Sequence, residues 1–282
     1  MKTSRRKLPY WKRNNPAASF DIARLRPKTL ARGKRFESPS DAHEDSVRSQ
    51  VLLGRYRRGK AYGVYLQECR EGHYQCERTY CAQCARTFRR YFTGQLLRLS
   101  SELKGEVHIL VVLIETAPKG ELLKLEIERY RHSLRKRLDR AGLGKVPVIG
   151  GFEMYYRARS KEWILHINLV IFGGNEKAIR RFEDGFSDDE IHRPVRRDDL
   201  KDDAEQLSYI LKFTTYHRPR QQHGARKAKA MPLNPAEHFE LVHWMAQYEF
   251  SDHLFLLNAR RRGTTIELSR ARTHKSSLNG AA

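Results

Sequence analysis

The spacing of apolar residues changes along the chain, and each spacing predicts a different element. Over residues 84–104 apolar side chains recur every three to four positions, which predicts a helix with a basic outer face. Residues 107–114 are almost continuously apolar and rich in β-branched side chains, so we expect a central buried strand there. Helical spacing returns over residues 122–138 and ends at Gly142.

Two later segments alternate strictly between apolar and other positions. Residues 151–158 and 163–172 have this period of two on either side of a short polar connection, which predicts a β-hairpin. A short helix over 176–183, a strand around 191–196 and a helix over 198–216 are expected to follow. The order β, α, β, β, α, β, α predicts an α+β fold built on an antiparallel sheet.

The composition indicates a polyanionic partner. The 282 residues include 55 Lys and Arg against 33 Asp and Glu, which gives a formal charge of +22. Such an excess of positive charge favours binding to nucleic acid. The longest apolar run, residues 107–114, is far shorter than the roughly 18 residues that span a bilayer. The basic start has no apolar stretch behind it, so we expect no secretory signal. We therefore expect a cytoplasmic protein without a membrane partner.

The basic residues are grouped in segments. Residues 1–35 carry twelve Lys or Arg and one acid, and further groups follow over residues 218–229 and near the end. The N-terminal segment is either a solubilising tail or an arm that neutralises phosphates, and the other basic segments favour the arm. We expect four parts: a basic arm, a Cys-rich segment with its helix, the sheet domain, and a basic C-terminal helix and tail, at residues 1–60, 61–104, 105–217 and 218–282.

The predicted hairpin carries a candidate metal site. In its second strand the odd positions are apolar, whereas His166 and Asn168 project together from the other face. Glu153 on the first strand lies opposite His166 if the turn has two residues, and opposite Asn168 if it has four. A carboxylate, an imidazole and an amide oxygen suit Mg²⁺ or Mn²⁺. The alternative is the polar solvent face of an ordinary hairpin.

The helix predicted over residues 198–216 carries a candidate nucleophile. Glu205, Tyr209 and Lys212 have the spacing that places them on one side of a helix. A tyrosine hydroxyl can attack a phosphodiester, and a lysine one turn away can stabilise the developing negative charge. Glu205 can activate a water molecule or the hydroxyl of a second strand. Tyr216, seven residues after Tyr209, is a rival nucleophile or a packing residue.

Four cysteines lie within one short stretch, and the chain has no others. Their spacing, C-x6-C-x4-C-x2-C, suits a closed tetrahedral site for structural Zn²⁺, in which His73 is an alternative to the first cysteine. The proposed ligands are Cys69, Cys76, Cys81 and Cys84. The site would hold nearby arginines toward DNA, and a second arginine group near the end of the chain is a further DNA-binding candidate. These residues are Arg86, Arg89 and Arg90, and Arg260, Arg261 and Arg262.

Several short motifs together resemble those of a known family. HINLVIF on the predicted second hairpin strand, GFEMYY before it and EQLSYILK in a later helix are similar to motifs of rolling-circle replication initiators. These are HUH endonucleases, and the likeness is to the single-tyrosine Rep proteins of bacterial plasmids. VHILVVLIETAP resembles their first motif strand, and CERTYCAQC resembles a Cys-rich segment found in some of them. The resemblance covers roughly residues 69–217.

This resemblance implies an enzyme with an HUH-nuclease-like core over residues 105–217. It would nick one strand at an origin by transesterification, form a 5′-phosphotyrosine at Tyr209, and later rejoin or release the strand. His166 and Asn168 would be ligands of the catalytic Mg²⁺ or Mn²⁺, with Glu153 as the third. Lys212 would be the motif lysine and Glu205 the acid that helps to end the reaction. Single-stranded and double-stranded origin DNA, and a host replication helicase, would be its partners.

One departure from the family pattern leaves other functions open. The family has His, a bulky apolar residue and His, whereas this chain has Asn168 at the second place, and an amide oxygen is a weaker ligand than imidazole. A zinc-containing protein that binds DNA without nicking is therefore an alternative. An RNA-binding protein and a single-strand transposase with the same chemistry are the others.

Overall fold

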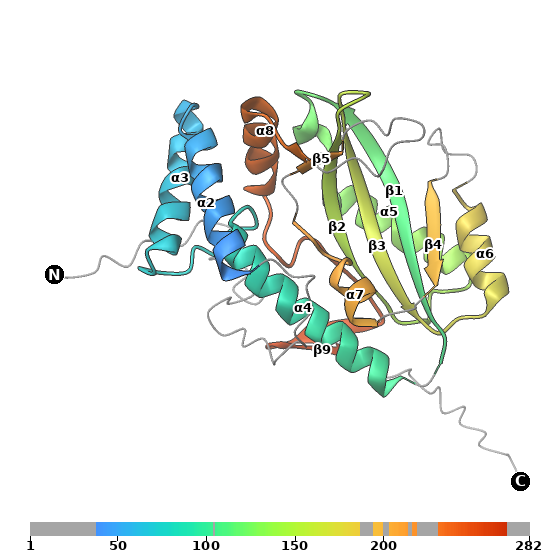
Figure 1. Cartoon of the computed structure of the whole chain (residues 1–282). Helices are drawn as coiled ribbons and strands as arrows, with labels where there is room; N and C mark the ends of the chain where they lie inside the picture. The colour runs from blue at the N-terminus through green and yellow to red at the C-terminus, as the bar shows by residue number, and fades with distance from the viewer. Residues whose placement is uncertain are drawn as a thin grey trace, which may run out of the picture.

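The computed structural model describes residues 38–103, 105–186, 194–199, 203–213, 216–218 and 231–269. It confirms the predicted fold class, because an antiparallel sheet lies between helices (Figure 1). The antiparallel strands lie in the order β4, β1, β3, β2 and β7. Their bounds are Val195–Asp199, Val107–Pro118, Glu162–Phe172, Val148–Arg157 and Leu254–Leu257.

The hairpin of β2 and β3 forms the centre of the sheet. Glu153 pairs with His166 and Gly151 with Asn168, which is the register that the shorter of the two expected turns gives. Beyond the antiparallel part, β5 (Tyr216–Arg218) runs parallel to the end of β2 and pairs with β6 (Met231–Pro232).

Helices cover both faces of the sheet. Figure 1 shows α5 (Ile127–Arg140) behind the sheet and α4 (Ala82–Glu102) crossing in front of it, with α7 (Asp203–Ser208) between α4 and the strands. A 3₁₀ turn, η2 (Leu122–Lys124), precedes α5, and α6 (Glu176–Asp184) lies beside β4. Consequently every residue of β3 from Trp163 to Phe172 is buried, on the even positions as well as the odd ones. The even positions therefore do not form the polar solvent face that was the alternative to a metal site.

Three helices form a unit beside the sheet. α2 (Pro39–Leu53) and α3 (Arg57–Arg70) are joined by a short turn, and α8 (Pro235–Met245) packs against α2 (Figure 1). One buried and one partly buried hydrogen bond fix this packing: Nε2 of His238 lies 2.8 Å from Oγ of Ser49, and Nδ1 of His243 lies 2.7 Å from the Tyr62 hydroxyl. We call α2, α3 and α8 the helical unit.

The structure corrects two of the expected boundaries. The basic arm does not extend to residue 60, because α2 and the start of α3 lie within that range, and residues 1–37 lie outside the described residues. The Ser38 side chain accepts a hydrogen bond from the Asp41 amide, and the Asp41 carboxylate accepts one from the Ser38 amide. This capping box begins α2.

The region after residue 218 is more than a helix and a tail. Its strand β7 completes the antiparallel part of the sheet, and Trp244, Phe250 and Phe255 are fully buried. Two more strands, β8 (Ala259–Arg262) and β9 (Thr265–Leu268), form a separate hairpin. The basic groups at residues 219–230 and after Ser269 lie outside the described residues. Within the described part of the chain, no helix has the length and apolar character needed to cross a membrane.

Candidate metal centre and candidate active site

The four cysteines are brought together by the end of one helix and the start of the next. Cys69 lies in the last turn of α3, and Gly72 then takes a positive φ of 75°. The amide of Gly72 bonds to the Cys69 carbonyl, and the amide of His73 bonds to the Glu68 carbonyl. This pattern is a Schellman motif, which ends the helix and turns the chain back toward α4.

The geometry of the sulfur atoms suits a tetrahedral metal ion. Cys81 is the N-cap residue of α4 and Cys84 lies in its first turn, so both face the end of α3. The four Sγ atoms lie within 4.8 Å of one another, with separations of 3.7 to 3.8 Å for three of the pairs. A tetrahedron with metal to sulfur bonds of 2.3 Å has edges of about 3.8 Å. All four side chains are buried and none forms a disulfide.

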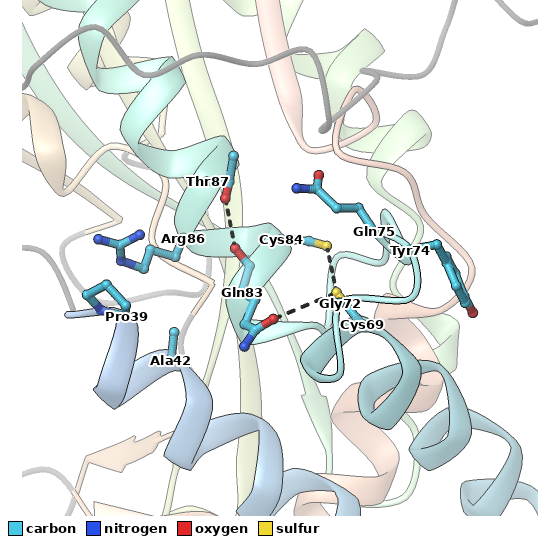
Figure 2. A pocket seen from close by; sticks show the side chains of 10 residues that line it. All are labelled: Pro39, Ala42, Cys69, Gly72, Tyr74, Gln75, Gln83, Cys84, Arg86 and Thr87. Carbon is cyan, nitrogen blue, oxygen red and sulfur yellow. Dashed lines mark hydrogen bonds between the residues drawn. The ribbon is translucent and has the colours of Figure 1, made fainter.

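The alternative ligand His73 lies outside this four-cysteine cluster. Its side chain is 65% exposed, and its Nδ1 faces Glu71 at 3.5 Å. Cys69 instead occupies the fourth position. A pocket of about 390 Å³ opens beside Cys69 and Cys84, and Figure 2 shows Gln83 reaching the Cys69 sulfur along its wall.

The sulfur atoms perturb one another's protonation. Hydrogen bonds from Cys76, Cys81 and Cys84 hold the pKa of the Cys69 thiol below its usual value. The same contacts, led by the one with Cys69, raise the pKa of Cys84. A cation bound among these thiols would favour their ionised forms.

The arginines that follow the cluster have different surroundings. Arg89 was expected to contact DNA, but its side chain is only 2% exposed and its Nε donates to the carbonyl of Ser208 at 2.9 Å. The prediction for Arg89 is therefore wrong. Its position in α4 lies on the side of the helix that packs against α7. Arg86 and Arg90 are partly exposed, and Arg86 lines the pocket.

The second candidate site lies on the sheet face beneath α7. Nε2 of His166 lies 3.3 Å from Oε2 of Glu153, and both side chains are nearly buried. The same Glu153 oxygen accepts a hydrogen bond of 3.0 Å from Nδ2 of Asn168. The structure thus brings together the three predicted ligand residues, which we call the sheet-face cluster. A β-bulge interrupts β1 between Leu113 and Glu115, beside His166, as is common next to functional sites.

Asn168 links this cluster to the segment that carries Tyr209. Besides Glu153, its Nδ2 donates to the backbone carbonyls of Tyr209 and Ile210, both at 3.3 Å. Gly151 makes this approach possible, because a Cβ there would lie only 2.7 Å from the Ile210 carbonyl and 2.6 Å from a Leu211 side-chain atom. Sequence analysis missed Gly151, although a glycine paired with a buried polar residue in a strand is a recognised sign of close backbone approach.

The predicted helix around Tyr209 is wrong in its extent. α7 ends at Ser208, and the amides of Tyr209 and Ile210 bond to carbonyls three residues back, which closes the helix with a tight turn. Glu205, Tyr209 and Lys212 therefore do not share one helical face. The Tyr209 ring is 48% exposed, and Nζ of Lys212 lies 5.2 Å from its centre. The side chains of Glu205 and Tyr216 lie outside the described residues.

Unpartnered polar atoms test whether the sheet-face cluster fits a metal. Oε1 of Glu153 and Nδ1 of His166 are buried and have no hydrogen-bond partner in the described structure. Such atoms are costly unless something binds them. A carboxylate and an imidazole also suit a divalent cation, so these two residues fit one. Asn168 fits less well, because it turns its amide nitrogen, which does not bind cations, toward Glu153.

The arginines near the end of the chain lie on the hairpin of β8 and β9. Arg260 and Arg262 are exposed and each lies 3.9 Å from Oε2 of Glu267. Arg261 points to the other side, where partial burial lowers its pKa and Tyr91 and Glu249 lie nearby. Arg260 and Arg262 therefore lie on the surface, whereas Arg261 is partly buried.

Comparison with family models, curated proteins and solved structures finds no match to this chain.

Proposed function

We propose that this protein is a replication initiator that nicks one DNA strand by tyrosine transesterification, as the motif resemblance implies. The observation that carries the proposal is the contact between the sheet-face cluster and the tyrosine segment. Asn168 bonds both to Glu153 and to the carbonyl of Tyr209. Residues that are more than forty positions apart in the sequence therefore meet where a ligand set and a nucleophile are both required.

In the proposed reaction the Tyr209 hydroxyl oxygen attacks the scissile phosphorus. The bond from phosphorus to the 3′ oxygen breaks, the 5′ phosphate becomes linked to Tyr209, and the proton lost by the phenol is balanced by one gained by the 3′ oxygen. Exposure of the Tyr209 ring leaves it open to a strand of DNA. The Lys212 ammonium beside that ring stabilises negative charge on the phenolate oxygen.

A divalent cation, Mg²⁺ or Mn²⁺, would be held by Glu153 and His166 and would polarise the scissile phosphate. Asn168 acts through the backbone in this proposal: by holding the carbonyls of Tyr209 and Ile210 it sets where the tyrosine segment lies relative to those two residues. It is a positioning residue, and the family's second imidazole is replaced by an amide with a different task.

The four-cysteine cluster has a separate, structural role in the proposal. Four thiolate ligands would enclose Zn²⁺ and leave no position for water or substrate. The ion would join the end of α3 to the start of α4 and so fix the helical unit against the helix that covers α7.

A DNA-binding protein that does not nick is the second candidate, and one observation favours it. The nitrogen of Asn168 is shared among Glu153 and two carbonyls, so the third ligand position of the family pattern is occupied by an internal contact. If two ligands do not retain a cation, the cluster is only a buried polar network and Tyr209 is an ordinary surface residue.

The two candidates differ in whether a covalent adduct forms. We expect the protein, incubated with labelled single-stranded origin DNA and Mn²⁺, to form an adduct that Tyr209→Phe eliminates, because only the nucleophilic oxygen is lost. Tyr216→Phe is the matched control and should retain the adduct. An adduct that persists in Tyr209→Phe and vanishes in Tyr216→Phe would overturn the assignment of Tyr209. A wild-type protein that forms no adduct but binds the DNA would favour the second candidate.

A further inference from the structure

A group of cations on the outer side of α3 has no assigned role. Between Asp45 and Glu68 the sequence contains no acid, yet it includes Arg55 in the turn before α3 and three basic residues in the first half of the helix. All four side chains are exposed: Arg55, Arg57, Arg58 and Lys60.

These cations form no ion pair in the part of the chain that the structure describes. By contrast, Arg98 is paired with Glu102 and Arg180 with Glu176, each within one turn of its helix. The cations also do not stabilise α3, because its first turn has no acid and positive charge near a helix N-terminus is unfavourable. These four side chains are therefore available to bind a negatively charged partner.

The shape of this surface is that of a straight, accessible helix. Arg57, Lys60, Ala61 and Val64 are exposed on the side of α3 opposite the buried Gly63 and Leu66. Val64 is 46% exposed, so small apolar side chains lie among the cations. Figure 1 shows α3 at the outer edge of the helical unit.

The helix is held firmly in this position. Its C-terminal turn carries Cys69 of the four-cysteine cluster, and its middle is tied to α8 through the bond between Tyr62 and His243. Tyr56, just before α3, stacks on Phe239 of α8 with ring centres 4.5 Å apart. A rigid element loses little conformational freedom when it binds.

We propose that this face of α3 docks on double-stranded DNA, with Arg55, Arg57 and Lys60 on phosphates and Ala61 and Val64 facing the floor of the major groove. The groove admits one α-helix, and small apolar side chains can contact thymine methyl groups there. A single strand fits this face less well, because single-strand sites rely on exposed aromatic side chains and the described part of this face has none. The inference rests on the proposed function only in taking DNA as the nucleic acid.

The test compares two triple variants that remove the same charge. The first is Arg55→Gln, Arg57→Gln and Lys60→Gln; the matched control is Lys124→Gln, Arg180→Gln and Arg196→Gln, whose side chains are 71 to 72% exposed and paired with acids. Binding to a labelled 30-base-pair DNA duplex is measured by fluorescence anisotropy over a range of salt concentrations. We expect the first variant to bind about 10²-fold more weakly near 0.1 M salt and its log–log salt slope to fall by about 2 to 3. The control should change by less than about threefold.

Four results would overturn the proposal. The first two are an equal loss of duplex affinity in both variants, and no loss of duplex affinity in the α3 variant. The third is that the α3 variant loses as much affinity for a 30-nucleotide single strand as for the duplex. The fourth is that the wild-type protein binds duplex RNA as tightly as duplex DNA. Thermal melting of each variant checks folding. If the α3 variant melts early, Arg55→Lys with Arg57→Lys, which keeps the charge, should retain duplex binding, and weak binding by that pair would also count against the surface. No step at Tyr209 is needed for these measurements, so their result is separate from that of nicking.

Discussion

In the four-cysteine cluster every candidate ligand atom comes from one short stretch, residues 69–84, and the atoms are alike. In the sheet-face cluster the ligand-type atoms differ chemically and come from two strands, while a third segment supplies Tyr209. The cysteines contact mainly one another, whereas Asn168 already satisfies Glu153 and two carbonyls. The first cluster could therefore hold a structural metal ion such as zinc, whereas the second is partly satisfied without an ion.

The two clusters differ in how strongly their own contacts indicate a bound metal ion. Four buried sulfur atoms at tetrahedral separations are the arrangement that a structural metal ion requires, and a packed core alone has no need of it. A carboxylate beside an imidazole also occurs as an ordinary ion pair, so the sheet-face cluster depends on the unpartnered Oε1 of Glu153 and Nδ1 of His166 for its interpretation as a cation site. Variants that act on one cluster alone can separate the two interpretations.

The largest effect is expected from the four-cysteine cluster. Cys81→Ser with Cys84→Ser should eliminate one bound zinc per chain and loosen the region before residue 105, because structural zinc sites contribute roughly 10 to 16 kcal/mol to ordering such segments. Metal analysis of protein purified without chelator, and amide exchange over α3 and α4, measure both effects. His73→Ser is the control and should keep the zinc. Wild-type protein without zinc would contradict the prediction.

Much of the fold could be predicted because neighbouring residues carry the signal. The alternation at residues 163–172 predicted the hairpin and left two registers for Glu153, of which the structure has the one that pairs it with His166. The cysteine spacing likewise predicted a cluster of four, which the structure also has. In both places the residues that interact lie within one hairpin or one helix pair.

What the sequence did not reveal depends on contacts between distant segments. The helix at Tyr209 was expected to be long because its apolar spacing continues. In the structure the helix ends at Ser208, and the next residues pack against Gly151 of the sheet. Arg89 was expected on the surface because the residue spacing within α4 does not show which side of that helix α7 covers. β7 is only four residues long, which is too short for a period to be recognised. α2, however, had a local signal in Ser38, Pro39 and Asp41 that could have been used.

A second prediction concerns the catalytic side of the comparison. Glu205 lies in α7, one turn before Tyr209 in the sequence. If it activates the water that releases the strand, Glu205→Ala should still form the adduct but should accumulate it, since general-base help is typically worth 10² to 10⁴ in rate. Formation and decay of the adduct are timed separately. Unchanged decay would exclude the hydrolytic role, and loss of the first nick with a higher metal requirement would indicate a ligand instead.

A third prediction tests a contact inside the helical unit, where α8 packs against α2. Burial lowers the pKa of His238 to about 4, and its Nε2 lies against Ser49. Protonation therefore favours the unfolded chain, so the contribution of neutral His238 is fully present above pH 6.5 and is lost as the pH falls toward 4. The free energy of unfolding should fall by on the order of 3 kcal/mol over this range. Urea unfolding at several pH values measures it, and His238→Gln should make the dependence less steep. Part of it should remain, because burial also lowers the pKa of His253 to about 4. An equally steep variant would contradict the assignment to His238.

The smallest effect, and the sharpest test of the sheet-face cluster, is expected at Asn168. Asn168→Asp keeps the shape and an oxygen ligand but removes the amide hydrogens, so that carboxylate oxygens would face Glu153 and the carbonyls of Tyr209 and Ile210. If Asn168 positions the tyrosine segment, the variant should lose about 1 to 3 kcal/mol of stability and form the adduct more slowly at saturating Mn²⁺. If Asn168 is instead a metal ligand, the added charge should tighten Mn²⁺ binding and speed the reaction at low Mn²⁺.

Asn168→His further distinguishes the positioning role from the ligand role, because an imidazole restores a strong ligand but cannot donate to all three acceptors. Tighter Mn²⁺ binding with unchanged stability in both variants would show that Asn168 is a ligand, whereas slower adduct formation that extra Mn²⁺ does not restore would show that it holds the backbone of Tyr209.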